Sequence, residues 1–136
     1  MSTLLVRNIH TLLTMDHHRR ELRDASLFIR DGVIEAVGSL TEMPAQTADQ
    51  VLDLSHHIVL PGLVNTHHHM VQSLTRVCAQ DSELFGWLKT LYPIWSRLTG
   101  NAVYTASKLA MAELILSGCT TSSDHLYIYP NDVTLD

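Results

Sequence analysis

Residues 59–69 read Val59-Leu60-Pro61-Gly62-Leu63-Val64-Asn65-Thr66-His67-His68-His69. Short apolar runs flank Pro-Gly, and the second ends in three histidines. Such runs predict buried strands, and imidazoles at the rim of a buried element are ready metal ligands. Side chains at i and i+2 of a strand share a face. His67 and His69 are therefore predicted to converge as metal ligands, while His68 points away.

Composition narrows the class of protein. The chain has 136 residues, of which 46% are hydrophobic and 17% charged, and this predicts one core-forming domain or a small domain plus part of another. The net charge is −5 and basic residues are scattered, so no nucleic-acid or membrane partner is expected. Two separated cysteines, with no CxxC motif, signal peptide or membrane span, predict a reducing, cytoplasmic location.

The sequence of residues 1–58 predicts short strands separated by turns. Strands are expected at 4–9, continued after a bend by 12–15, and at 26–30, 33–38, 51–54 and 58–60. Asp31-Gly32 separates two apolar runs, and this pair is a strong hairpin signal because glycine tolerates the positive φ of a tight turn. We expect this block to form a small antiparallel β unit.

The pattern changes after Pro61-Gly62. Residues 63–66 predict a fully buried strand of parallel type. Helical spacing follows over residues 84–98, with Pro93 as a kink or break, and then over 102–117, a helix apolar on most sides and so expected between layers. Asn101 is its predicted N-cap and Gly118 its C′ residue. A strand at 119–125 completes the pattern of a right-handed parallel βαβ unit.

Candidate site residues cluster where the two parallel strands are expected to end. A catalytic zinc takes about three protein ligands and keeps an open position, so His67 and His69 would supply part of a site; the alternative is a polar strand end that only forms hydrogen bonds. The carboxyl ends of neighbouring parallel strands meet, which brings Asp124 and His125 near the metal, as ligands or in a supporting role. We take His125 as a candidate substrate contact.

Two further side chains are candidates for substrate binding. Gln72 follows His69 by three residues, and its carboxamide both donates and accepts, so it could hydrogen-bond the edge of a base; the alternative is a solvated loop residue. Trp87 could stack on a planar ligand, together with Tyr92 and Trp95. At helical spacing these aromatic residues could equally belong to the core.

The motif Pro61-Gly62-Leu63-Val64-Asn65-Thr66-His67-His68-His69 resembles the PG-x-x-[N/D]-x-H-x-H signature of the amidohydrolase superfamily, metal-dependent hydrolases built on a (β/α)8 barrel. The hairpin at 30–34 and the strand at 51–54 resemble the start of that superfamily's β-sandwich. The resemblance implies an α/β fold with a β-sandwich. Residues 1–58 would form the N-terminal portion of a small β-sandwich, and residues 59–136 the first β/α units of a truncated TIM barrel.

Within the superfamily, the chain is similar to purine and triazine deaminases. His67-x-His69-x-x-Gln72 is similar to the pattern of guanine deaminases, in which the glutamine contacts the purine edge. The segments 84–88, 91–95 and 117–127 look most like 8-oxoguanine deaminases and are close to hydroxyatrazine ethylaminohydrolases. The resemblance implies that His67 and His69 bind one divalent metal, zinc in preference to iron, and that Gln72 contacts substrate. His68 falls on a variable position and inherits no role.

The resemblance also predicts what this chain does not supply. Family members take further metal ligands and their acid/base residues from later barrel strands, and a complete barrel takes about 250 residues. We therefore interpret the sequence as an N-terminal fragment, with the acid/base residues expected beyond Asp136. The expected function is hydrolytic deamination of a purine-type heterocycle such as 8-oxoguanine, a small-molecule substrate. The alternatives are an N-alkylamino-triazine aminohydrolase, or an inactive truncated chain that binds metal weakly. Whether the intact enzyme forms a homo-oligomer is left open.

Overall fold

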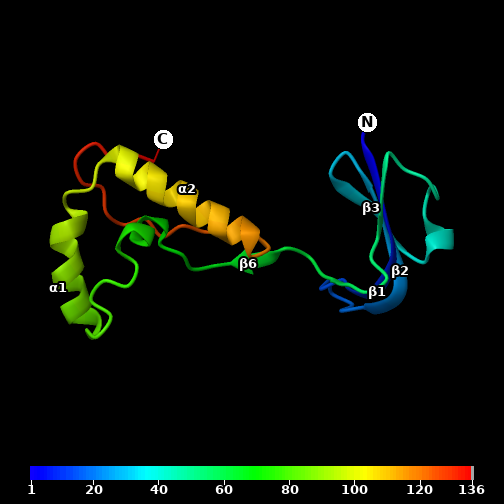
Figure 1. Cartoon of the computed structure of the whole chain (residues 1–136), viewed down its shortest axis with the longest axis horizontal. Helices are drawn as coiled ribbons and strands as arrows, with labels where there is room; N and C mark the ends of the chain where they lie inside the picture. Colours follow the sequence, from blue (N-terminus) through cyan, green and yellow to red (C-terminus); the bar gives the residue numbers. More distant parts are fainter. Residues whose placement is uncertain (136) are drawn as a thin grey trace. The chain divides into compact units, whose positions relative to one another are not determined.

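The chain consists of two compact units, one ending at Pro61 and the other beginning at Gly62 (Figure 1). The structure is a computed structural model that describes residues 1–135. Each unit is described by itself. Within residues 1–135, no helix has both the length and the apolar character needed to cross a membrane.

The first unit is a five-stranded sheet. Its strands are β1 (Thr3–Leu13), β2 (Glu21–Arg30), β3 (Val33–Gly38), β4 (Gln50–Asp53) and β5 (Ile58–Val59), and a short 3-10 helix spans Leu40–Glu42. The sheet order is β3-β2-β1-β4, and β5 also pairs with β1. The predicted hairpin is confirmed: β2 and β3 run antiparallel, and Asp31 and Gly32 both have positive φ between them.

The prediction of an antiparallel unit is wrong for two of the strands. β4 and β5 both run parallel to β1, with Leu5 opposite Val51 and Thr11 opposite Ile58. The cause lies in β1, whose pairing with β2 shifts between Val6 and Ile9, where Asn8 is left-handed. A bulge of this kind bends a strand. The two halves of β1 accordingly pair with different partners, β4 with the first half and β5 with the second.

The sheet of the first unit buries side chains on both faces. Successive side chains of a strand point to opposite faces, so the neighbours Leu5 and Val6 enter different clusters. Leu5 packs with Phe28 and Met43, whereas Val6 packs with Ile9, Leu12, Ala25 and Leu27. The expected β-sandwich stays a prediction, because a second sheet is not seen among the strands of residues 1–61.

The second unit has the predicted strand–helix–strand order. Its elements are β6 (Leu63–Asn65), the 3-10 helix η2 (Met70–Thr75), α1 (Leu84–Trp95), α2 (Gly100–Leu116) and β7 (Cys119–Ser122). β6 and β7 pair in parallel, from Leu63 opposite Cys119 to Asn65 opposite Ser122. Parallel neighbours need a long crossover, and here the two helices supply it. Such a unit is the building block of a parallel α/β sheet.

Several boundaries of the second unit differ from the predicted ones. The N-cap of α2 is Thr99, whose hydroxyl accepts from the amide of Ala102, and not Asn101. β7 ends at Ser122, three residues before His125. α1 continues through Pro93 to Trp95. The predicted end of α2 is confirmed, because Gly118 follows it with a φ of 84°.

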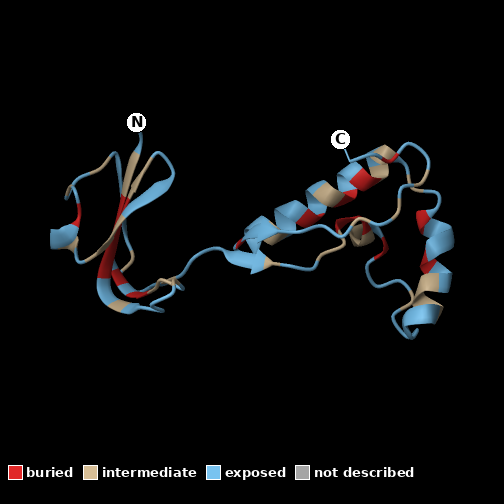
Figure 2. Cartoon of the chain, turned by 180° about the vertical axis from the view of Figure 1, so that it is seen from behind, coloured by how far each residue is buried: buried red, intermediate tan, exposed pale blue. Residues whose placement is uncertain are grey.

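The predicted burial of β6 and α2 is wrong in part. Val64 is 64% exposed, because the two-stranded sheet of this unit leaves much of β6 uncovered. Helix α2 buries one face only, where Val103 packs against Val71 of η2 and Val133. The rest of the helix is mostly exposed, as Figure 2 shows by colour, and its exposed residues include Leu109, Met111 and Ile115. The core that holds the site is therefore the contact between α2 and η2.

Candidate metal centre

Backbone contacts beyond the strands hold the histidine segment against the segment that follows β7. The amide of Ser123 donates to the carbonyl of Asn65 (3.0 Å), and the amide of His125 donates to the carbonyl of His68 (2.7 Å). The hydroxyl of Ser123 also donates to the carbonyl of Thr66 (2.8 Å). The ends of β6 and β7 therefore lie side by side, as expected for parallel strands. This is what brings residues more than fifty positions apart into one site.

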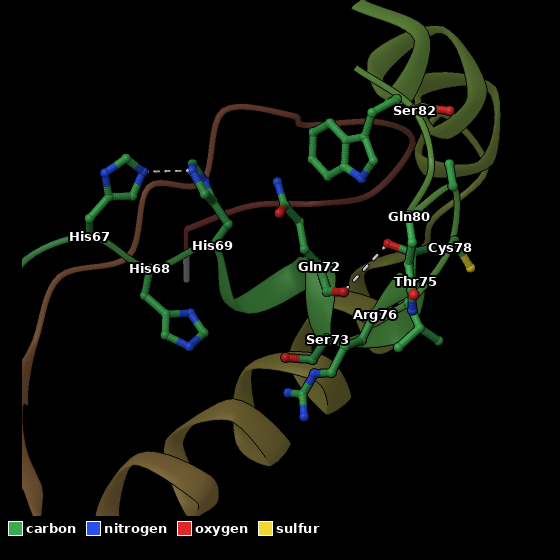
Figure 3. A pocket seen from close by; sticks show the side chains of 13 residues that line it. His67, His68, His69, Gln72, Ser73, Thr75, Arg76, Cys78, Gln80 and Ser82 are labelled. Atoms are coloured by element: carbon green, nitrogen blue, oxygen red, sulfur yellow. Dashed lines mark hydrogen bonds between the residues drawn. The ribbon is translucent and has the colours of Figure 1, made fainter. Parts of the chain in front are cut away.

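Three imidazoles meet at this edge. One ring nitrogen from each of His67, His69 and His125 lies within 4.8 Å of the others. His67 Nε2 and His69 Nε2 are 3.0 Å apart, so the predicted pair does converge (Figure 3). Two zinc ligands at about 2.0–2.1 Å in a tetrahedral arrangement are separated by about 3.3 Å. The spacing of this pair therefore fits a single metal ion.

A backbone contact prepares His69 for metal binding. Its Nδ1 lies 2.7 Å from the carbonyl oxygen of His125, which can only accept a hydrogen bond. The proton therefore sits on Nδ1 and the lone pair on Nε2, the atom that faces His67. Metal-binding histidines commonly donate their second ring N–H to a carbonyl, which fixes the ring. The donor set and its support thus fit a divalent metal.

The ring of His125 is placed differently from the other two. It stacks on His67 with centroids 4.5 Å apart and planes 18° apart. A nitrogen lone pair lies in the plane of its ring, so the lone pairs of two nearly parallel stacked rings do not converge on one point. This geometry favours His67 and His69 as the ligand pair. His125 then contributes its carbonyl to His69 and stacks its ring on His67.

His68 projects to the opposite side from His67 and His69, as strand alternation predicts (Figure 3). Its Nδ1 is buried without a hydrogen-bond partner among the described residues. On that side, Arg76, the residue after η2, makes a bidentate ion pair with Glu113 of α2, with nitrogen–oxygen distances of 3.0 and 2.6 Å. The hydrogen bonds from Arg76 lower the pKa of Glu113. Glu113 is therefore a structural partner of Arg76.

A cavity of about 510 Å³ opens beside the histidines. Its lining includes His67, His69, Gln72 and Trp87, but not His125. Trp87 packs edge-to-face on Trp95, whose indole N–H donates to Thr75 (3.0 Å) within the core. Trp95 is thus the core residue of the aromatic group, and Trp87 reaches the cavity. Imidazoles, a carboxamide and an indole around one space suit a flat, polar heterocycle.

Tyr127 also belongs to the site, although the sequence did not predict it. The Nε2 of Gln72 donates to the hydroxyl of Tyr127 (3.0 Å), and the ring of Tyr127 lies edge-on to His69, with centroids 5.2 Å apart. Burial raises the pKa of Tyr127, and the hydrogen bond from Gln72 opposes that shift. Only its closeness to Asp124-His125 in the sequence could have indicated it. Asp124 accepts a hydrogen bond from the amide of Met70 (3.0 Å). This contact is a supporting role, the predicted alternative to metal binding by Asp124.

Comparison with known proteins agrees with this geometry. Residues 58–135, more than half of the chain, match the amidohydrolase family. The chain belongs to the amidohydrolase family. Membership of this family explains both the sequence motif and the parallel strands that carry histidines at their carboxyl ends.

Two relatives and one solved structure are similar to the chain. It is 52% identical to an 8-oxoguanine deaminase from Pseudomonas aeruginosa over 76% of the chain, and 38% identical to a 5'-deoxyadenosine deaminase from Methanosarcina barkeri over 97%. It spans 24% and 30% of their lengths. An atrazine chlorohydrolase from Arthrobacter aurescens, solved with zinc and atraton, superposes with a TM-score of 0.84 at 26% identity, covering 94% of this chain and 30% of that one.

Proposed function

We propose that this chain supplies the first part of the metal centre of a hydrolytic deaminase that acts on a purine-type heterocycle of the 8-oxoguanine kind. In that reaction water adds to the ring carbon that carries the amino group, the C–N bond breaks, and ammonia leaves. His67 and His69 would hold one divalent metal, zinc in preference to iron. Such a metal, when bound, lowers the pKa of bound water toward about 7.

The observation that carries this proposal is the convergence of His67 Nε2 and His69 Nε2, with the proton of His69 held on Nδ1 by a carbonyl. The cavity beside them supports the substrate class. Gln72 has one acceptor and one donor free for a heterocycle, since its other N–H donates to Tyr127, and Trp87 offers an aromatic face. These residues bind and orient the ring next to the metal ligands. The relative of highest identity reported above, an 8-oxoguanine deaminase, points to the same class.

The second candidate is an aminohydrolase of N-alkylamino-triazines. It is favoured by the likeness to a hydroxydechloroatrazine ethylaminohydrolase from a Pseudomonas species, which is 32% identical over 95% of this chain. A triazine and a purine both present ring nitrogens next to an exocyclic amine, so the same cavity suits either. The two candidates differ in the leaving group, which is ammonia from the purine and an alkylamine from the triazine.

The experiment that tests the proposal measures metal content and turnover of the full-length enzyme that contains this chain. Substrates are 8-oxoguanine, 5'-deoxyadenosine and an N-ethylamino-triazine. We expect ammonia from 8-oxoguanine, and we expect His67→Ala and His69→Ala each to lose the bound zinc and at least about 100-fold in kcat/KM, as loss of a metal ligand does. Zinc is quantified by elemental analysis after dialysis against a weak chelator.

The matched control is His57→Ala, which removes an exposed histidine of the first unit. It should keep both zinc and activity, and the circular dichroism of all three variants should match the parent. Zinc and turnover retained in either His67→Ala or His69→Ala would overturn the proposal. Release of ethylamine in place of ammonia would establish the triazine alternative.

A further inference from the structure

The side-chain amide of Gln72 is already hydrogen-bonded within the protein. One of its two amide N–H groups already donates to the hydroxyl of Tyr127, 3.0 Å away. A carboxamide has two N–H donors and a carbonyl acceptor. The contact therefore leaves one donor and one acceptor for a ligand, and it also determines which end of the amide lies toward Tyr127.

Tyr127 is held in place independently of Gln72. Its ring packs edge-on against His69 and Trp95, with centroids 5.2 and 6.3 Å apart. Trp95 is 1% exposed and is hydrogen-bonded to Thr75. Two residues before Tyr127, the amide of His125 is hydrogen-bonded to His68. Although 41% exposed, Tyr127 thus contacts both a metal-ligand candidate and the carboxamide of Gln72.

We propose that Tyr127 is a positioning residue that acts through Gln72 and makes the site selective for a ring edge with a carbonyl next to an N–H. The inference rests on the proposed function and deepens it. A carboxamide with one donor and one acceptor free, held in one orientation, matches a lactam edge bidentately. A ring that carries alkylamino groups at that edge matches it less well, so the site prefers the lactam. Without Tyr127, Gln72 rotates and must be ordered by the substrate itself.

The test is Tyr127→Phe in the full-length enzyme, with 8-oxoguanine as substrate. The ring and its packing remain, and only the hydroxyl is lost. One neutral hydrogen bond is worth about 0.5–1.5 kcal/mol, or about two- to twelvefold in binding. We therefore expect KM to rise about two- to twelvefold, kcat to stay within about twofold, and zinc content to stay unchanged.

The matched control is Tyr129→Phe. Tyr129 lies on the same segment, and its hydroxyl donates to the carbonyl of Leu126 (3.3 Å), away from Gln72. This variant should leave KM unchanged. In a Gln72→Ala background, Tyr127→Phe should add nothing further, because the group through which it acts is gone. Equal effects of the two tyrosine variants, or additive effects of Tyr127→Phe and Gln72→Ala, would overturn the inference.

A second readout does not depend on turnover. The side-chain amide protons of Gln72, observed by NMR, should move toward random-coil shifts in Tyr127→Phe and stay in place in Tyr129→Phe. Unmoved signals in Tyr127→Phe would overturn the inference even in an active enzyme. A full-length enzyme that turns over none of the three substrates would instead overturn the proposed function, while the NMR result still decides the role of Tyr127.

Discussion

At the scale of single residues, Asp16 shows how charge stabilises a turn. It lies between β1 and β2, where its carboxylate accepts from Arg20 (2.7 Å) and from the amide of His18 (3.0 Å). The hydrogen bond from Arg20 is the main reason that the pKa of Asp16 falls from 3.8 to about 2. A carboxyl with a lowered folded-state pKa stabilises the fold above its unfolded pKa, and this contribution is lost as the pH falls through the folded pKa.

We therefore expect Asp16→Asn to lower the urea midpoint of the first unit at pH 7, and the difference from the parent to shrink as the pH falls from about 4 toward 2. NMR signals of β1 and β2 report the midpoint at each pH. The control is Asp24→Asn, an exposed aspartate of β2 that tolerates the same change at its positive φ. A deficit of Asp16→Asn that persists unchanged to pH 2 would contradict this assignment.

Strand alternation alone predicted, from the sequence, that His67 and His69 would lie together and His68 apart. It could not predict how His125 is oriented, because the stack on His67 depends on the path of the chain after β7, which ends before His125. Tyr127 was missed for the same reason. Its importance comes from a hydrogen bond to a residue 55 positions away, and no local pattern encodes such a contact.

At the scale of elements, Gly62 determines how closely β6 can approach β7. A Cβ placed on Gly62 would overlap the side chain of Thr120. We expect Gly62→Ala to destabilise the second unit by about 1–3 kcal/mol, the usual cost of overpacking. Urea unfolding, followed by the fluorescence of Trp87 and Trp95, measures the loss, and zinc affinity should fall with it because the histidines follow β6.

Thr120→Gly provides the matched rescue. The double variant removes the side chain that the new methyl group meets, so it should be more stable than Gly62→Ala alone. Gly86→Ala is a second control, because its Cβ would approach Glu83 no closer than 3.3 Å, and it should be tolerated. A Gly62→Ala variant as stable as the parent would show that close packing is not the reason for glycine here.

The order of elements was predictable, but the pairing of the short strands was not. Asp31-Gly32 and the change from strand to helical spacing are local signals, and both were confirmed. The parallel pairing of β4 and β5 with β1 depends on a bulge at Asn8, which sends the two halves of one strand to different partners. Burial of β6 was predicted from its apolar residues. In the described residues Val64 stays 64% exposed, because how far a strand is covered depends on its neighbours and not on its own residues.

At the scale of the whole molecule, the described residues bring together a candidate pair of metal ligands, but no carboxylate lines the cavity beside them. The lining of the cavity contains no aspartate or glutamate, and its histidines are the candidate ligands and His68. General acid–base catalysis needs a titratable group within about 2.6–3.2 Å of the proton that moves. The chain also spans only 24% of the 8-oxoguanine deaminase to which it is similar. We therefore expect this chain alone to bind the metal without catalysing deamination, and a longer protein that contains it to do both.

We expect the 136-residue chain alone to bind zinc through His67 and His69, more weakly than the full-length enzyme, and to release no ammonia from 8-oxoguanine. The two are compared at equal zinc occupancy, with bound zinc quantified in each sample, so that a difference in turnover cannot come from a difference in metal content. His69→Ala in the short chain is the control for specific binding, since it removes the imidazole held by the carbonyl of His125. Turnover by the short chain would show that an acid/base group lies within it, and Tyr127 and His125 would then be the first groups to substitute.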